Sequence, residues 1–191
     1  MRFSALPVLM DTKVHCAPVL ENHTSCLIRV NTQRSPNDER RVNQKTDPMS
    51  IALAEAHGAA ARGEVPIGAV VVKDGTILAQ AGNRTRELSD PTAHAEILVI
   101  REACRILDDE RLTGCDLYVT LEPCTMCAAA ISFARIRRLY YGAQDIKGGG
   151  VENGARFFAQ PTCHHVPEVY SGFQEQDVEI MLKEFFRSKR F

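Results

Sequence analysis

The chain has 191 residues, of which 45% are hydrophobic and 25% are charged, a balance that is typical of a single globular domain. Its formal net charge is −1, so no overall basic field attracts nucleic acid, and any such contact must come from a local patch. No apolar run is long enough to form a membrane-spanning helix, so we expect no membrane association.

The first 46 residues differ in character from the rest of the chain. They show no sustained hydrophobic period of 2 or 3.6 residues, and they end in the polar stretch 31–41. We interpret residues 1–46 as a disordered extension. One alternative is an organellar transit peptide, against which the acidic residues of this stretch argue. Another is an overlong reading of the start, with Met10 or Met49 as the initiator.

The seven cysteines favour a reducing compartment. An odd number of cysteines with a single Cys-x-x-Cys pair does not suit a disulfide framework. We therefore expect a cytoplasmic protein.

The predicted helices and strands begin at Asp47, an N-cap residue that is followed by proline at the first helical position. Further along, Lys73-Asp74-Gly75-Thr76 has the composition of a hairpin turn between two apolar runs. In chain order the sequence predicts a helix from 48 to 63, strands at 67–72 and 77–81, a helix at 94–107, a strand at 116–121, a helix at 123–135, strands at 137–142 and 166–170, and an amphipathic helix at 175–190. Strands that alternate with helices predict an α/β sandwich around a central sheet, which we place at residues 47–191.

Two short segments form a split metal-binding pattern. They are His94-Ala95-Glu96 and Pro123-Cys124-Thr125-Met126-Cys127, whose first cysteine lies thirty positions after the histidine. One imidazole and two thiolates are ligands that suit Zn2+. Three protein ligands leave one coordination position for water, as in catalytic zinc sites and unlike closed structural ones. The order His-x-Glu…Pro-Cys-x-x-Cys is the known signature of zinc nucleobase deaminases.

Glu96 is predicted to be the general acid/base of this site and not a further ligand. It lies two residues after His94, so in a regular helix the two side chains do not face the same way. A carboxylate beside a metal-activated water can take its proton and return it to a leaving amine.

The cysteine pair also has structural interpretations. It could be a redox pair or half of a structural zinc site, which the cluster Cys163-His164-His165 could complete. Adjacent side chains on an extended strand point in alternate directions, which argues against this cluster as the second half of a site.

The end of the chain combines aromatic and basic side chains. Residues 185–191 contain three phenylalanines, two arginines and one lysine. Composition alone favours a solvated helix end whose cations suit the helix dipole. The alternative is a patch that contacts phosphates and stacks on bases of single-stranded nucleic acid.

A set of longer motifs lies between about residue 47 and residue 190: Glu64-Val-Pro-Ile-Gly-Ala-Val70, Gly82-Asn83-Arg84, Thr92-Ala-His-Ala-Glu-Ile97, Leu117-Tyr-Val-Thr-Leu-Glu-Pro-Cys-Thr-Met-Cys127 and Phe185-Phe-Arg-Ser-Lys-Arg190. With these motifs about three quarters of the chain resembles the bacterial tRNA-specific adenosine deaminase family, within the cytidine-deaminase-like superfamily. The resemblance implies a three-layer α/β/α sandwich with a five-stranded mixed central sheet. It also implies a homodimer with one catalytic Zn2+ per subunit, which converts the wobble adenosine of a tRNA anticodon stem-loop to inosine and releases ammonia.

The resemblance carries over residue by residue onto the motifs. It implies zinc binding by His94, Cys124 and Cys127, proton transfer by Glu96, a hydrogen bond from Asn83 to the flipped base, packing of Ile67 against that base, and contacts of Phe186, Arg187 and Arg190 with the anticodon loop.

Two segments depart from the family pattern. The stretch before residue 47 has no counterpart, and residues 147–156, leading into 161–165, differ from the version found in the best-known members. The main alternative function is therefore a free-base or nucleoside deaminase, such as a guanine deaminase, which shares the zinc motif. A zinc-stabilised RNA-binding module without catalysis is a third alternative, but a structural site has no use for a proton shuttle such as Glu96.

Overall fold

The computed structural model describes residues 47–189; the proposed extension at 1–46 and the predicted contact residue Arg190 lie outside this range. The described part is built on a five-stranded sheet with the strand order β2-β1-β3-β4-β5. The strands are β1 (Gly68–Lys73), β2 (Thr76–Gly82), β3 (Cys115–Leu121), β4 (Arg138–Ala143) and β5 (Glu168–Tyr170). Strand β1 pairs antiparallel with β2 and β3, whereas β3, β4 and β5 are parallel. The predicted five-stranded mixed sheet is confirmed.

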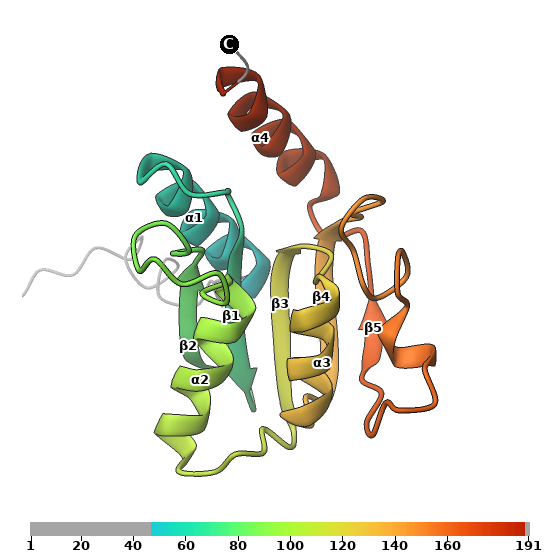
Figure 1. Cartoon of the computed structure of the whole chain (residues 1–191). Helices are drawn as coiled ribbons and strands as arrows, with labels where there is room; N and C mark the ends of the chain where they lie inside the picture. The colour runs from blue at the N-terminus through green and yellow to red at the C-terminus, as the bar shows by residue number, and fades with distance from the viewer. Residues whose placement is uncertain (1–46, 190–191) are drawn as a thin grey trace, which may run out of the picture. The chain divides into compact units, whose positions relative to one another are not determined.

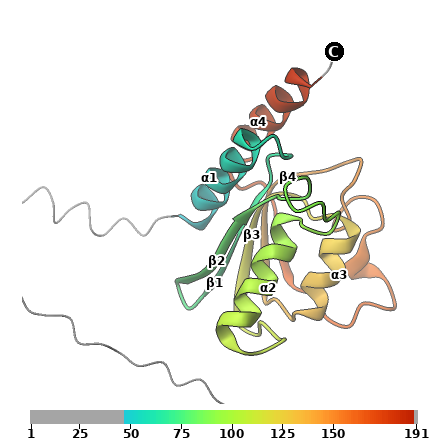
Figure 2. The ribbon, with the colours of Figure 1, turned by 60° about the vertical axis from the view of Figure 1, so that its left-hand side comes forward.

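Helices cover both faces of the sheet and complete the predicted three layers (Figures 1 and 2). They are α1 (Pro48–Ala61), α2 (Ala95–Leu107), α3 (Thr125–Phe133) and α4 (Glu175–Ser188), with a short 3-10 helix, η1, at Phe157–Ala159. Strand β1 shows why a helical layer is needed on each side of the sheet, because the strand is apolar on both faces. Val70 and Val72 pack against α1, whereas Ala69 and Val71 belong to the main core with α2 and α3. None of the helices within residues 47–189 is long and apolar enough to cross a membrane.

All the predicted helices and strands are present, and most differences are at their ends. The helix predicted over 123–135 is shorter, because Cys124 is extended (φ −68°, ψ 171°) and Arg135 has a left-handed φ of 59°. Cys124 therefore precedes the first turn of α3 instead of lying within it, which corrects the expected placement. The 3-10 helix η1 was not predicted, since its segment carries no hydrophobic period.

The ends of several strands and helices lie at one edge of the sheet. Strands β3 and β4 are parallel, so their carboxyl ends meet at this edge, and α3 begins directly after β3. Helix α2 begins at the same edge (Figure 1). Such an edge is where α/β folds place their sites.

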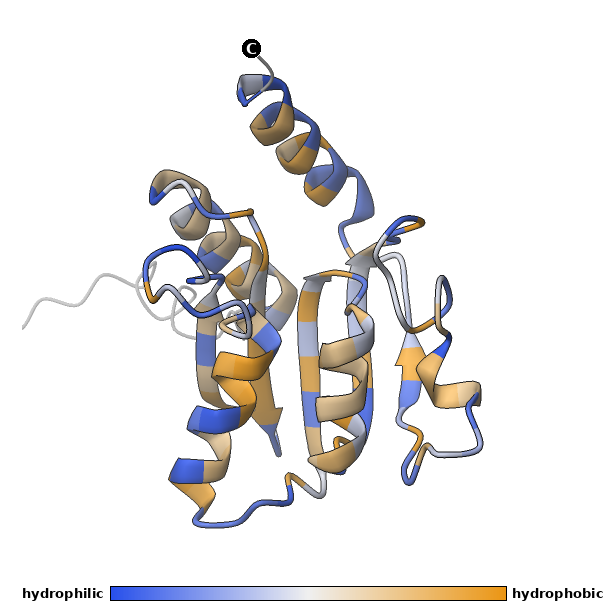
Figure 3. Cartoon of the chain, in the orientation of Figure 1, coloured by the Kyte–Doolittle hydropathy of each residue, from blue (hydrophilic) through white to orange (hydrophobic). Residues whose placement is uncertain are grey.

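Helix α4 is anchored by its first half only. Val178 and Met181 are buried, whereas Phe186 is 48% exposed. Apolar residues continue along the helix beyond the point where it leaves the sheet (Figure 3). Within the described residues, Phe186 near the end of α4 is therefore exposed to contact with another molecule.

Candidate metal centre and active site

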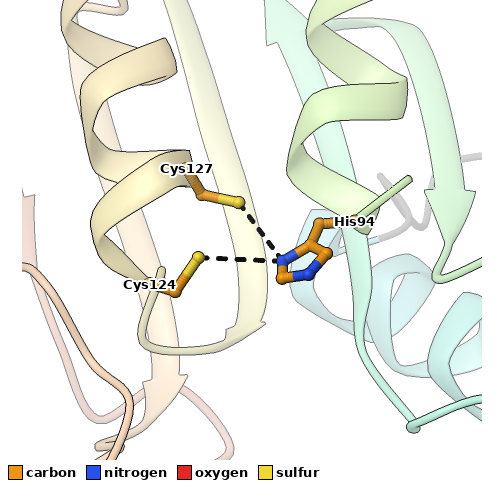
Figure 4. A group of neighbouring side chains, drawn as sticks. All are labelled: His94, Cys124 and Cys127. Atoms are coloured by element: carbon orange, nitrogen blue, oxygen red, sulfur yellow. Dashed lines mark hydrogen bonds between the residues drawn. The ribbon is translucent and has the colours of Figure 1, made fainter. Parts of the chain in front are cut away.

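Three side chains that the sequence marks as ligands converge at this edge (Figure 4). The Nδ1 atom of His94 lies 3.7 Å from the Sγ of Cys124 and 3.5 Å from the Sγ of Cys127. With Zn–N and Zn–S bonds of about 2.05 and 2.3 Å, a tetrahedral zinc holds nitrogen and sulfur about 3.6 Å apart. Among residues 47–189, this is the one group of three or more His, Cys, Asp or Glu side chains whose ligand atoms come this close together. The donor set and its spacing both fit zinc.

Two of these side chains occupy helix N-cap positions. His94 is the N-cap of α2 and Cys124 is the N-cap of α3, and neither side chain makes a capping hydrogen bond. N-caps are ordinarily Ser, Thr, Asp or Asn, whose oxygen accepts from the first turn. At α2 this acceptor comes from elsewhere, because the Ala95 N–H donates to Asn83 Oδ1 at 2.8 Å. The ligand atoms thus remain directed toward one another.

The two thiols titrate as a pair. The pKa of Cys124 is lowered to about 4 because Cys127 hydrogen-bonds to it and the His94 ring lies beside it. The same pairing, together with burial, raises the pKa of Cys127. A second thiolate so close to the first needs a cation to offset the charge, which is what a zinc ion between the two sulfurs provides.

Glu96 is a buried carboxylate with an unused oxygen. Its side chain is 3% exposed, and Glu96 Oε2 is the one buried side-chain oxygen or nitrogen of residues 47–189 that has no hydrogen-bond partner. Burial raises the pKa of its carboxyl. Buried polar atoms are almost always paired, so an unpaired one next to His94 indicates a functional role.

Asn83 directly follows the end of β2, and Ile67 directly precedes the start of the antiparallel strand β1, so both lie at the same edge of the sheet. The backbone N–H of Asn83 donates to the Ile67 carbonyl at 2.9 Å, which holds the two residues together. Asn83 Oδ1 accepts from the Ala95 N–H, so the NH2 group of the same amide is the part of the side chain that can donate to a ligand. Ile67 is half-buried against the main core.

Phe186 and Arg187 lie on a basic groove at the free end of α4. The groove, of about 870 Å³, is lined by Lys147, Leu182, Lys183, Phe186, Arg187 and Lys189. Of its four cations, Lys183 alone makes an ion pair within the described residues, to Glu179 at 2.6 Å. Lys147 lies on a loop whose Gly149 pairs with Cys124, so the groove and the metal centre share this loop.

The Cys163-His164-His165 cluster does not join the metal centre. Cys163 Sγ lies 3.4 Å from Ser132 Oγ, and His165 Nε2 bonds the Ile136 carbonyl at 2.6 Å. These bonds hold residues 163–165 against α3 and the residues that directly follow it.

Sequence reasoning missed two buried glutamates that organise the loops around the site. Glu64 accepts the N–H groups of Arg86 and Glu87 at 2.9 and 2.8 Å, in the loop before His94. Glu122 likewise accepts backbone N–H groups of the loop after β4, among them those of Asp145 and Val151. Its position directly before Pro123 is the only signal in the sequence that could have pointed to it.

The chain is similar in sequence and structure to known proteins. The family model for the cytidine and deoxycytidylate deaminase zinc-binding region matches residues 42–143. A tRNA-specific adenosine deaminase of Agrobacterium fabrum is 68% identical over 147 residues, which cover 77% of this chain and 97% of the relative. A solved structure from work on A-to-I editing by tRNA:A34 deaminases at the wobble position is 70% identical, with a TM-score of 0.70 over 71% of this chain and 98% of that one. A guanine deaminase from Nitrosomonas europaea is 23% identical, with a TM-score of 0.63 over 72% of this chain and 82% of that one, a likeness of fold alone.

Proposed function

The chain belongs to the tRNA-specific adenosine deaminases of the cytidine and deoxycytidylate deaminase zinc-binding family, and from this membership we propose that it converts the wobble adenosine of tRNA anticodons to inosine. The observation that carries the chemistry is the His94–Cys124–Cys127 triangle with zinc spacing beside the unpaired oxygen of Glu96.

The residues of the site take separate roles in this reaction. His94, Cys124 and Cys127 would hold a zinc ion, which would supply the Lewis acid for attack of water on C6 of adenine. Glu96 Oε2 accepts a proton from the attacking water and delivers it to the departing amine, so that adenosine and water give inosine and ammonia. Glu96 Oε2 is buried and has no other hydrogen-bond partner among the described residues, which supports its assignment as the proton carrier.

The target base must leave its stack to reach this site. We assign the Asn83 amide nitrogen as a donor to the flipped base and Ile67 as the apolar surface on which it packs. The bond from Ala95 fixes the orientation of the Asn83 amide before substrate binds, which supports this assignment.

The substrate is tested by comparing tRNA with a free base. Purified protein should form inosine at the wobble position of tRNA, read by sequencing, and should leave free guanine unchanged. The basic groove at α4 supports tRNA, because a small base needs no such surface. Turnover of guanine but not of tRNA would replace the proposed substrate with the guanine deaminase alternative and keep the zinc chemistry.

We assign Phe186, Arg187 and Arg190 to the anticodon loop. Replacing Arg187 and Arg190 together with alanine should weaken tRNA binding, because each arginine is proposed to neutralise a phosphate. The slope of log K against log salt should fall by about 1 for each lost contact. Fluorescence anisotropy with an anticodon stem-loop over a range of salt measures both effects.

The matched control for this variant is Arg105→Ala, at the far end of α2. Arg105 is exposed and pairs only with Glu102 among the described residues, so its loss should not change tRNA affinity. An unchanged salt slope in the double variant would remove the C-terminal residues from the tRNA interface.

We propose a cytoplasmic homodimer. The five cysteines of residues 47–189 are free, which supports a reducing compartment. Phe133 on α3 is 65% exposed, an apolar side chain of the kind that subunit interfaces cover.

We place the deaminase domain at residues 47–191 and expect deletion of 1–46 to leave it folded and active. The sequence before residue 47 lacks the hydrophobic period needed to join a core, and the Agrobacterium relative aligns over 97% of its length to 77% of this chain. Thermal unfolding and inosine formation compare the two proteins. A large fall in the melting temperature would show that the deleted segment packs against the domain.

A further inference from the structure

The carboxylate of Glu122 receives five hydrogen bonds from a single loop. Its Oε1 accepts from the backbone N–H of Val151, Glu152 and Asn153 at 3.1, 2.9 and 2.9 Å. Its Oε2 accepts from the Asp145 N–H at 3.0 Å and from Asn153 Nδ2 at 2.6 Å. Glu122 is 3% exposed, so these donors take the place of water. The side chain of Glu122 is therefore hydrogen-bonded to both ends of the loop 145–153.

The middle of this loop lies against the backbone that carries Cys124. Gly149 pairs with Cys124 in an isolated antiparallel bridge, and the Gly150 N–H donates to the Pro123 carbonyl at 2.8 Å. A Cβ atom on Gly150 would lie 2.5 Å from the Thr125 nitrogen, so only glycine lets the loop approach the backbone of Cys124 and Thr125 this closely. Cys124 makes no capping bond of its own, and its extended backbone is held by these outside contacts.

An ionised carboxylate is the group this arrangement requires. Both of its oxygens are acceptors only, and bonds to a charged acceptor are stronger than neutral ones. A glutamine of the same shape would place its NH2 group either against the Asp145 N–H and Asn153 Nδ2 or against the three N–H groups at Oε1. In both orientations at least two donors lose their partner.

We infer that Glu122 is a positioning residue of the zinc site. Through the loop 145–153 it fixes the backbone of Cys124, and with it the position of the sulfur relative to His94 and Cys127. The inference rests on the assignment of Cys124 as a zinc ligand in the proposed function. Groups that orient a ligand from outside the coordination shell typically change metal affinity by roughly 10- to 100-fold.

The test is Glu122→Gln in the full-length protein. The dissociation constant for zinc, measured by competition with a chromogenic chelator, should rise by roughly 10- to 100-fold. The visible absorption bands of the cobalt-substituted variant should shift, because they report the geometry of the thiolate ligands. The matched control is Glu152→Gln, which removes the same charge from the loop that Glu122 holds. Its amide oxygen can still accept from the Tyr141 hydroxyl, so zinc affinity and the cobalt spectrum should not change.

The outcomes separate this inference from the proposed function. A folded Glu122→Gln variant with wild-type zinc affinity and an unchanged cobalt spectrum would overturn the positioning role and leave the zinc assignment intact. A wild-type protein that binds no zinc would overturn the assignment itself. If Glu122→Gln does not fold, Asn153→Ala, which removes one of the five donors, should weaken zinc binding several-fold, and an unchanged affinity there would overturn the inference.

Discussion

Replacing Glu96 with alanine is expected to abolish deamination while the protein keeps its zinc and its fold. The side chain makes no hydrogen bond through Oε2 to any described residue, and it lies outside the group of three ligand atoms. Its removal therefore deprives the reaction of its proposed proton carrier without removing a proposed metal ligand. A fall in the rate constant for inosine formation of roughly three orders of magnitude or more is the expected size of the effect.

Zinc content and thermal unfolding complete the test of Glu96. Because a buried carboxyl with an unpaired oxygen is unfavourable for folding, the melting temperature of Glu96→Ala should not fall. Glu96→Gln, which keeps the size of the side chain but cannot carry the proton, should be equally inactive. A variant that lost its zinc would show instead that Glu96 is a ligand.

Replacing Cys124 or Cys127 with serine is expected to remove zinc and activity together. A serine hydroxyl is a much weaker ligand than a thiolate for zinc, and two of the three proposed protein ligands are these sulfurs. Metal analysis of the purified variants should find essentially no zinc, and inosine formation should fall below detection.

Cys163→Ser is the matched control for the cysteine variants. Cys163 hydrogen-bonds to Ser132 and to the His165 carbonyl, and it does not belong to the metal group. This variant should retain both zinc and activity. Zinc retained by Cys124→Ser, or lost by Cys163→Ser, would contradict the proposed ligand set.

The sequence motifs were sufficient to predict that His94 and the cysteine pair come together, because zinc chemistry demands particular residue types at particular spacings. They did not predict the contacts that support these side chains. The role of Glu96 as proton carrier stays a prediction. The order of the strands and helices followed from hydrophobic periods that each segment carries locally.

The contacts that hold the site could not be predicted in this way. The bond from Ala95 to Asn83 spans 12 residues, and the bonds from the 145–153 loop to Glu122 span 23 to 31 residues. Such contacts join loops without a hydrophobic period, so no local pattern marks them. The placement of Cys124 was wrong for the same reason, because the Gly149–Gly150 segment holds its backbone outside the helix.

The position of the proposed ligands at the starts of two helices would make a bound zinc ion a cross-link within the fold. His94 lies at the start of α2 and the cysteines at the start of α3, thirty or more residues along the chain. An ion that bridges these two elements binds the folded protein and not the unfolded chain, so it stabilises the fold by mass action. At a free zinc concentration 1,000 times the dissociation constant, this amounts to about 4 kcal/mol. The resistance of the protein to unfolding, and hence its abundance in a cell, should therefore vary with the supply of zinc.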